Sequence, residues 1–336
     1  MKILVTGGTG FLGRHIVWRL AELGHEVIFT GRQALAAATV IRLSQAPVRW
    51  IELQHGAAET QLKLMEAAQG FDAIVHSAAL SSPWGKPEDF ERANILGTKE
   101  VLMACSAAQI KRLVHISTPS LYFDFQDRLN IREDQPLPKP VNYYAQTKAQ
   151  SEQLVQASCV PERVILRPRA IFGPWDNTLM PRILRVMSQG AIPLMRDGQA
   201  LLDITYVDNL VDAIVLALSQ PLPGKVQTYN VSNGEPQTLL SLLEQMAEAF
   251  ALPLKTRHLP WWLVSSAART LELAAKLGDG REPAITRYGA GVLAFSQTLD
   301  LSAIRRDLGY QPHISIAEGL QRHAAWFAQQ PAQALP

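Results

Sequence analysis

The first thirteen residues constrain the fold of this chain more than any other stretch. The apolar run Ile3-Leu4-Val5 has no helical periodicity and predicts a buried strand. A cluster of glycines follows directly, and residues 11–23 then have the spacing of a helix. This order places a helix N-terminus, with its unpaired N–H groups and the positive end of its dipole, where a pyrophosphate can bind.

The glycines allow two spacings. Gly8-x-Gly10-x-x-Gly13 is the general dinucleotide fingerprint, and Gly7-x-x-Gly10-x-x-Gly13 is a variant of it. Either spacing serves a tight turn, a close approach of the backbone to phosphate and close packing of helix on strand. The alternative is a structural turn without a ligand, but the position on the first strand favours dinucleotide binding.

Composition limits the class of protein. The chain has 336 residues, of which 47% are apolar and 18% charged, as is typical of a folded globular protein. A net charge of +2 gives no electrostatic argument for nucleic acid. Cys105 and Cys159 lack metal-ligand spacing, so we expect no metal site and no disulfide framework. This cysteine usage, and a strand that begins at residue 2 with no cleavable signal before it, predict a cytoplasmic protein.

Strands and helices alternate along the first half of the chain. We expect strands at 26–30, 48–53, 73–76, 113–117 and 163–167, helices at 87–108 and 141–157, and a loop at 119–140. The alternation predicts an α/β fold with a Rossmann-type doubly wound parallel sheet. We assign residues 1–168, plus about 203–231, to a dinucleotide-binding domain. Residues 169–202 and 232–330 are expected to form a smaller, mostly helical C-terminal substrate lobe over the carboxyl ends of the strands.

Residues 259–277 form the most apolar stretch of the second half. Arg269, Glu272 and Lys276 interrupt it, which argues against a membrane span. The sequence leaves open whether this helix is a lid, a peripheral membrane contact or an ordinarily packed surface helix.

The end of the second predicted strand indicates the cofactor. NAD sites usually carry an acidic residue there to bind the ribose 2′-hydroxyl. This chain has Thr30-Gly31-Arg32 instead, and a guanidinium is suited to a 2′-phosphate. NADP(H) is therefore favoured over NAD(H). If Arg32 were only a solvated surface residue, Gly31 would be left unexplained.

Tyr144 and Lys148 form a candidate catalytic pair. Residues four apart lie on one face of a helix, so the phenol and the ammonium can point into the same cleft. A neighbouring positive charge favours the phenolate and brings the tyrosine toward a useful acid–base range. Ser117 and Thr118, at the carboxyl end of a predicted strand, are placed to bind the reacting oxygen.

These motifs, with Leu166-Arg-Pro168, resemble the extended short-chain dehydrogenase/reductases of the NAD-dependent epimerase/dehydratase superfamily. The resemblance implies hydride transfer, with Tyr144 as acid/base and Lys148 lowering its pKa and holding the nicotinamide ribose. It also implies that Asn94 braces the site, although a buried asparagine bonded to backbone would look the same. Family members commonly dimerise through the helices that correspond to 87–108 and 141–157. The candidate cofactor-binding residues are Gly7, Thr9, Gly10, Phe11, Leu12, Gly13, Arg32, Ser77, Ala78, Ala79, Asn94, Tyr144, Lys148, Pro168 and Ile171.

The chain departs from this family near the adenine. The family usually has an aspartate after the third strand, where this chain reads Gln54-His-Gly-Ala57. Adenine recognition must therefore come from backbone or from another side chain.

Two positions indicate the substrate branch. Nucleotide-sugar enzymes of the family carry an asparagine and an arginine for the diphosphate, where this chain has Ala170 and Leu202. The same regions, with Arg281-Glu-Pro-Ala-Ile-Thr286 and Asp307-Leu-Gly-Tyr-Gln-Pro312, resemble the 3β-hydroxysteroid dehydrogenase branch and its bacterial 2-alkyl-3-oxoalkanoate reductases. The candidate substrate residues are Ser82, Trp84, Tyr122 and Arg169. Arg169, Arg182 and Arg185 either bind a carboxylate or phosphate of the substrate or are solvated charges.

Three functions follow from these patterns. The first is an NADP(H)-dependent oxidoreductase that interconverts a ketone and a secondary alcohol on an apolar or lipid-like small molecule, without nucleic acid and as a homodimer. The second is a nucleotide-sugar epimerase or dehydratase with tightly bound cofactor. The third is a non-enzymatic NADP(H) sensor. The sequence leaves the substrate, the physiological direction and the oligomeric state open.

Overall fold

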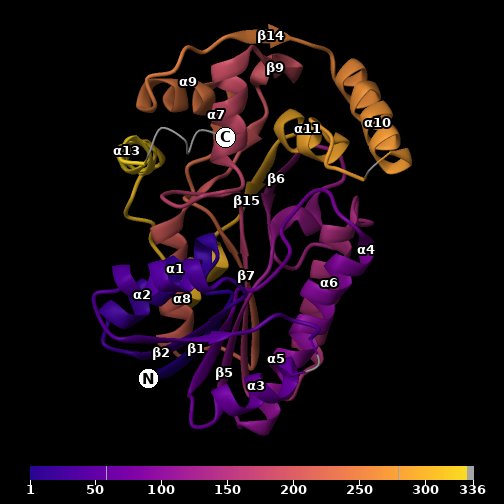
Figure 1. Cartoon of the computed structure of the whole chain (residues 1–336). Coiled ribbons are helices and arrows are strands. Elements are labelled where there is room, and N and C mark those ends of the chain that lie inside the picture. The colour runs from indigo at the N-terminus through magenta and orange to yellow at the C-terminus, as the bar shows by residue number, and fades with distance from the viewer. Residues whose placement is uncertain (58, 279, 331–336) are drawn as a thin grey trace.

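The computed structural model (Figure 1) describes residues 1–57, 59–278 and 280–330 and is built around a seven-stranded sheet. Its strands, in chain order, are β1 (Lys2–Thr6), β2 (Glu26–Gly31), β3 (Val48–Glu52), β4 (Ala73–His76), β5 (Arg112–Ile116), β7 (Glu162–Pro168) and β12 (Val226–Val231). They lie in the order β12-β7-β5-β4-β1-β2-β3, and all neighbours are parallel. The predicted doubly wound parallel sheet is confirmed.

Helices cover both faces of this sheet, as parallel strands require. One face carries α1 (Phe11–Glu22), α2 (Ala34–Leu43) and α8 (Val207–Ser219), and the other carries α3 (Thr60–Ala68), α5 (Gly97–Ala107) and α6 (Tyr143–Ala157) (Figure 1). The strands are correspondingly apolar on both sides: Ile3, Leu4 and Val5 of β1 are fully buried. Strand order reverses between β1 and β4, so a ligand crevice is expected at their carboxyl ends.

The C-terminal lobe is mostly helical, as predicted, and lies beyond the carboxyl ends of the central strands (Figure 1). Its helices are α7 (Met180–Gln189), α9 (Leu239–Ala249), α10 (Trp261–Leu277), α11 (Arg287–Ala294) and α13 (Ile316–Ala328). A second apolar cluster, with Met180, Leu202, Leu242 and Leu320 among its members, forms its core.

Short strands join the lobe to the rest of the chain. One small sheet has the order β13-β10-β15-β6, and two others pair β11 with β8 and β14 with β9. These strands are β6 (Arg128–Ile131), β8 (Ile171–Phe172), β9 (Ile192–Leu194), β10 (Leu201–Leu202), β11 (Thr205–Tyr206), β13 (Gln237–Thr238), β14 (Thr256–His258) and β15 (Gln297–Leu299). Strand β6 lies inside the stretch expected to be loop, because β15 supplies its partner from far along the chain. Strand β11 is only two residues long, and the Asp203 carboxylate before it accepts a hydrogen bond from the Leu299 N–H.

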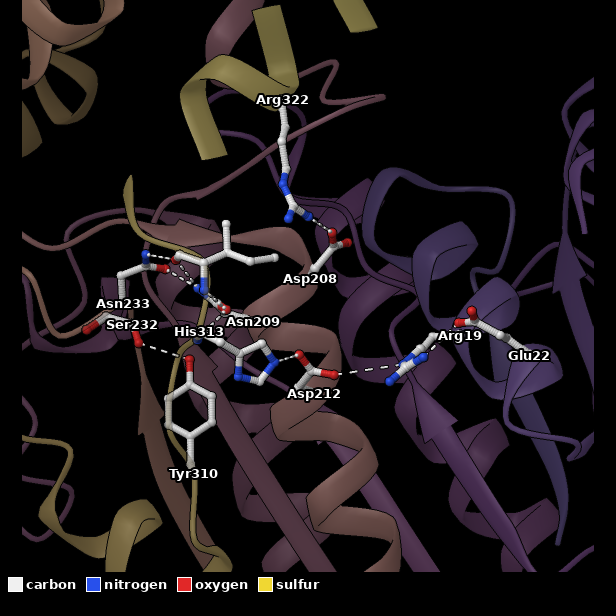
Figure 2. A network of polar contacts seen from close by, with 11 residues as sticks. Arg19, Glu22, Asp208, Asn209, Asp212, Ser232, Asn233, Tyr310, His313 and Arg322 are labelled. Carbon is white, nitrogen blue, oxygen red and sulfur yellow. Dashed lines mark hydrogen bonds and ion pairs between the residues drawn. The ribbon is translucent and has the colours of Figure 1, made fainter. Parts of the chain in front are cut away.

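Residues 299–314, which the sequence assigned to the lobe, pack against the nucleotide-binding part. Helix α12 (Ser302–Leu308) contributes Ile304 and Leu308 to the core of the main sheet. Figure 2 shows the polar network that fixes the following segment. Buried Asn209 of α8 accepts hydrogen bonds from the N–H groups of His313 and Ile314, and the Tyr310 hydroxyl donates to the Ser232 carbonyl at 3.0 Å.

Helix α10 buries only a narrow stripe of its side chains against the rest of the lobe. Val264, Ser265 and Ala268 are buried, whereas Trp262 and Leu277 are exposed. Among the helices of the described ranges, none combines the length and the apolar character needed to cross a bilayer. The interpretation of residues 259–277 as a lid or a peripheral membrane contact stays a prediction.

Candidate active site

The glycine turn forms a close junction between β1 and α1. Gly7 has φ +71°, and its carbonyl accepts a hydrogen bond from the Gly10 N–H at 2.9 Å. A Cβ on Gly13 would lie 2.1 Å from the Gly7 oxygen, so only glycine lets the helix approach this turn. Gly10 caps α1 without a side-chain hydrogen bond, and the first turn holds no acidic residue. The first N–H groups and the dipole of α1 are therefore available to a phosphate.

The side chain of Thr9 packs closely against the end of β2. A Cβ on Gly31 would lie 2.3 Å from the Thr9 hydroxyl oxygen, which explains why β2 ends in glycine. Arg32 follows and is exposed. Arg14 was not among the sequence candidates. Its guanidinium donates to the carbonyls of Thr9 and Gly10 and lies 4.5 Å from the centre of the Trp175 ring. Its place directly after Gly13 was the only signal that could have identified it.

The loop after β4 is bonded to the end of β1. The Ser77 hydroxyl donates to the Thr6 carbonyl at 2.7 Å, and the Ala78 N–H donates to the Thr6 hydroxyl. Asn94 lies in a π-helical turn, Glu91–Leu96, between α4 (Pro87–Phe90) and α5, and such turns are frequent at functional sites. Its side chain accepts from the Leu80 N–H at 2.8 Å and donates to the Thr147 hydroxyl at 3.0 Å. Asn94 thus ties this loop to α6, as a bracing residue would.

Tyr144 lies in the first turn of α6, next to two hydroxyl groups. Asn142 caps this helix by accepting a hydrogen bond from the Ala145 N–H at 2.8 Å. Burial raises the pKa of the Tyr144 phenol, and hydrogen bonds with Ser81 and Thr118 partly offset that rise. Because its pKa is raised, the Tyr144 phenol is protonated at neutral pH. Ser81 was not a sequence candidate, although its neighbour Ser82 was.

Lys148 lies one helical turn further along α6 and is 2% exposed. Its ammonium donates to the Ile116 carbonyl at 2.7 Å and lies 3.3 Å from Nε2 of His115. Burial lowers the pKa of Lys148 to about 8. Burial, and then the charge of Lys148, hold the pKa of His115 well below its ordinary value, so this imidazole is neutral. The role expected of Lys148, to lower the pKa of Tyr144, stays a prediction.

A row of hydroxyl groups extends from Thr118 into the lobe. The Thr118 hydroxyl donates to the Ser120 hydroxyl at 3.0 Å, and Ser120 lies 2.6 Å from the hydroxyl of Tyr288 on α11. Ser117 is buried beside Thr118, and its hydroxyl has no partner within the described part of the chain. No local pattern identified Tyr288, which lies 168 residues from Ser120.

Arg169 follows β7 and is 8% exposed. Its N–H donates to the Val231 carbonyl at 3.0 Å, and Nε has no partner within the residues that the structure describes. Burial lowers the pKa of this guanidinium, while Tyr288 and Asp203 act to raise it. The charge of Arg169 therefore interacts with Tyr288, the hydroxyl at the lobe end of the row.

The other substrate candidates have structural partners. The Ser82 hydroxyl donates to the Trp84 carbonyl at 2.7 Å within one turn, and the Trp84 indole donates to the Gly280 carbonyl at 2.9 Å, which ties this turn to the lobe. Tyr122 is 1% exposed and bonds to Asn230 and Arg167. The roles of these side chains in substrate binding remain predictions.

Comparison with known proteins identifies relatives of the chain. Residues 3–232 match the NAD dependent epimerase/dehydratase family. The chain is 34% identical to a 2-alkyl-3-oxoalkanoate reductase of Stenotrophomonas maltophilia, over 96% of this chain and 98% of that protein. It is 28% identical to the mouse decarboxylating sterol-4-alpha-carboxylate 3-dehydrogenase, over 96% and 89% of the two chains. The crystal structure of UDP-glucuronic acid 4-epimerase from Bacillus cereus superposes with a TM-score of 0.76, at 23% identity and 98% and 99% coverage, which shows the fold alone.

Proposed function

Because the chain belongs to the NAD-dependent epimerase/dehydratase family, we propose that it is an NADP(H)-dependent oxidoreductase that interconverts a ketone and a secondary alcohol on an apolar or lipid-like substrate. The observation that carries this proposal is the cluster of Tyr144, Thr118 and Ser81 in the crevice, with Lys148 one turn away on the same helix.

The side chains of this cluster have distinct roles. A bound nicotinamide dinucleotide supplies or accepts the hydride at the substrate carbon. In reduction, the Tyr144 phenol, protonated because burial raises its pKa, donates its proton to the carbonyl oxygen and regains one from solvent. The Thr118 hydroxyl orients that oxygen. Lys148 holds a positive charge behind the phenol, fixed by the Ile116 carbonyl.

The preference for NADP(H) rests on the end of β2. Exposed Arg32 follows Gly31, and no carboxylate occupies the position that binds a ribose 2′-hydroxyl in NAD sites. The side chain of Thr9 lies against Gly31, so the ribose end of the turn borders this arginine.

Two features support an apolar substrate over a nucleotide sugar. Both curated relatives have names that join an oxidoreductase activity to an alkanoate or a sterol carboxylate. Leu202, where nucleotide-sugar enzymes of this family carry an arginine, is 5% exposed and packs in the apolar core of the lobe. Ala170 offers no side-chain hydrogen bond either. A nucleotide diphosphate would lack two of its usual partners.

The test follows NADPH absorbance with a panel of long-chain ketones. We expect Tyr144→Phe to lower kcat about 10²- to 10⁴-fold, because it removes the general acid. Tyr143→Phe is the matched control, because Tyr143 is next in sequence but is 49% exposed and lies outside the cluster. This variant should reduce ketones at the wild-type rate. Full activity of Tyr144→Phe would refute the mechanism. Thermal stabilisation by UDP-sugars with no turnover of ketones would favour the epimerase, and NADP(H)-dependent partner binding without any turnover would favour the sensor.

Assembly and compartment are also proposals. Leu96 and Met103 are large apolar side chains exposed on the helical segment that includes α5. This segment lies beside α6, so the two side chains support a homodimer through these helices. Cys105 and Cys159 are free thiols, which suits a reducing cytoplasm.

A further inference from the structure

A cavity between α7 and α13 lies apart from the catalytic cluster. Its volume is about 480 Å³, and the cluster of Tyr144, Thr118 and Ser81 contributes none of the residues that line it. In Figure 1, α13 lies on the side of the molecule that carries α1, whereas α6, which carries Tyr144, lies on the other side. A cavity of this size can hold a small-molecule ligand.

The walls of this cavity are largely aromatic. Trp175, from the loop after β8, lies beside Trp326 of α13 with the ring centres 5.3 Å apart, and Phe327 follows on the same helix. These three side chains are partly exposed, and Met180 and Leu184 of α7 add apolar surface to the lining. Such walls favour a ligand with a planar ring that can stack on the aromatic side chains.

The backbone of Trp175 supports a ligand site at this wall. Its φ of +69° places it in the left-handed region, which is rare and strained for a bulky residue. The ring is nevertheless held in place, with the Arg14 guanidinium 4.5 Å from its centre and the ring of Trp18 at 6.1 Å. Strained residues that the surrounding structure holds in place cluster at active sites and ligand clamps.

The charges at the cavity leave one cation without a partner. The Arg182 guanidinium pairs with Glu282 at 2.8 Å, and both oxygens of buried Asp176 accept hydrogen bonds from N–H groups at the start of α7. Burial lowers the pKa of His323 to about 4, so this imidazole is neutral at pH 7, and its Nδ1 has no partner within the described part of the chain. Arg185 also lines the cavity and forms no ion pair with a carboxylate of the described residues. The cavity therefore favours a ligand with one negative charge.

We propose that this cavity is a second binding site, separate from the catalytic crevice, for a planar aromatic molecule with a single negative charge. The ring of the ligand stacks on Trp175 and Trp326, and the Arg185 guanidinium binds the anionic group. The inference goes beyond the proposed function and does not depend on it, because binding can be measured without turnover.

Calorimetric titration at pH 7 with 2-naphthoate, a planar ring system with one negative charge, tests the ligand class. We expect the wild type to bind it with a Kd below about 1 mM. The neutral 2-naphthamide should bind about tenfold more weakly, because it cannot form the charge-assisted hydrogen bond. Decahydronaphthalene-2-carboxylate keeps the size and the charge but lacks the planar ring, and it should bind about 2- to 10-fold more weakly, the range of aromatic stacking.

Variants assign the binding to the cavity. Arg185→Met should bring the preference for 2-naphthoate over 2-naphthamide toward one. Trp326→Leu should weaken 2-naphthoate binding about tenfold, and Trp326→Phe, which keeps a ring, should restore most of the affinity. The controls are Arg42→Met on α2 and Trp262→Leu on α10, which change exposed residues outside the cavity and should bind as the wild type does. The thermal midpoint of each variant shows whether it is folded.

The inference is overturned if the wild type does not bind 2-naphthoate, if 2-naphthamide binds equally well, or if folded Arg185→Met and Trp326→Leu bind as the wild type does. Competitive inhibition against a ketone, with an inhibition constant equal to the Kd of 2-naphthoate, would also overturn it, because the ligand would then occupy the substrate site. If no ketone is turned over, the proposed function fails, and the titrations still decide whether the second site exists.

Discussion

Tyr144 and Lys148 lie one helical turn apart, and burial shifts the pKa of each toward its uncharged form. Burial raises the pKa of the phenol and lowers that of the ammonium. Such opposed shifts are characteristic of catalytic groups, where stability is given up for reactivity. The ammonium contacts the Ile116 carbonyl and Nε2 of His115, and no carboxylate of the described residues forms an ion pair with it.

The cost of Lys148 can be measured against pH. The shift from an ordinary 10.5 to about 8 corresponds to about 3 kcal/mol of lost stability at pH 7. Lys148→Met removes the buried charge but also the hydrogen bond to the Ile116 carbonyl. With that loss included, we expect the free energy of unfolding of the variant, measured with urea, to exceed that of the wild type by roughly 1–3 kcal/mol. Between pH 8 and 10 the unfolded wild type still holds the proton that the folded state has released, so wild-type stability rises and the advantage of the variant shrinks. Lys99→Met, on the exposed side of α5, should show no such pH dependence.

The proposed preference for NADP(H) depends on Arg32, a single exposed residue. Arg32→Asp would remove the proposed partner of the 2′-phosphate and would supply a carboxylate for a ribose hydroxyl. We expect KM for NADPH to rise about tenfold or more, and KM for NADH to stay equal or fall. Arg42→Asp makes the same change in charge on exposed α2 and should leave both constants unchanged. A preference for NADPH that survives Arg32→Asp would assign the 2′-phosphate to another residue.

At the scale of elements, the β1–α1 turn depends on the absence of a side chain. In Gly13→Ala the new methyl group meets the Gly7 carbonyl oxygen at 2.1 Å, so the helix must move away from the turn. We expect a loss of about 1–3 kcal/mol in stability, as for other overpacked sites. Thermal stabilisation by NADPH should be lost as well. Gly190→Ala is the control, because its added methyl meets nothing within 4 Å and its φ of −172° suits alanine. A Gly13→Ala protein that binds NADPH normally would exclude this turn as the phosphate site.

The buried pair of Glu152 and Arg167 joins α6 to β7 one helical turn beyond Lys148. Both side chains are at most 4% exposed, and their atoms lie 2.6 Å apart. Glu152→Gln leaves the arginine charge uncompensated and should cost about 3–5 kcal/mol in urea unfolding. The double variant Glu152→Leu/Arg167→Met should recover much of this loss. Glu318→Gln breaks an exposed pair with Arg322 and should cost less than about 1 kcal/mol. A small effect at Glu152 would show that water reaches this pair.

The sequence predicted elements whose signals are local. Periodicity and the glycine spacing gave β1, α1 and the parallel sheet, and the four-residue spacing placed Tyr144 and Lys148 on one helix. The missed features depend on partners far apart in the chain. Strand β6 exists because its Asn130 N–H meets Thr298, and Tyr288 meets Ser120, each across 168 residues. No local pattern encodes such a pairing, since each partner alone resembles an ordinary loop or helix residue.

At the scale of the whole molecule, the lobe is joined to the nucleotide-binding part at several points around the crevice. The Tyr288 hydroxyl on α11 reaches the hydroxyl row, and the Trp84 indole donates to the carbonyl of Gly280, three residues after the end of α10. The Gln297 side chain donates to the Pro119 carbonyl at 3.0 Å, directly after Thr118. Residues from both parts therefore lie close to Thr118, and we expect the lobe to influence the substrate class.

The face formed by α5 and α6 is where we expect a second copy to bind. Met103 is 55% exposed and Leu96 is 42% exposed, although both lie on helices whose inner faces are fully packed. A stable interface buries more than about 1,000 Å², which requires both helices of each copy. In Met103→Glu a carboxylate would have to enter this interface without a partner, so we expect a monomer by light scattering at micromolar concentration, with the wild type a dimer. Leu35→Glu places the same charge on α2, where Leu35 is 87% exposed, and should stay dimeric. A monomeric wild type, or a dimeric Met103→Glu, would rule out assembly through this face.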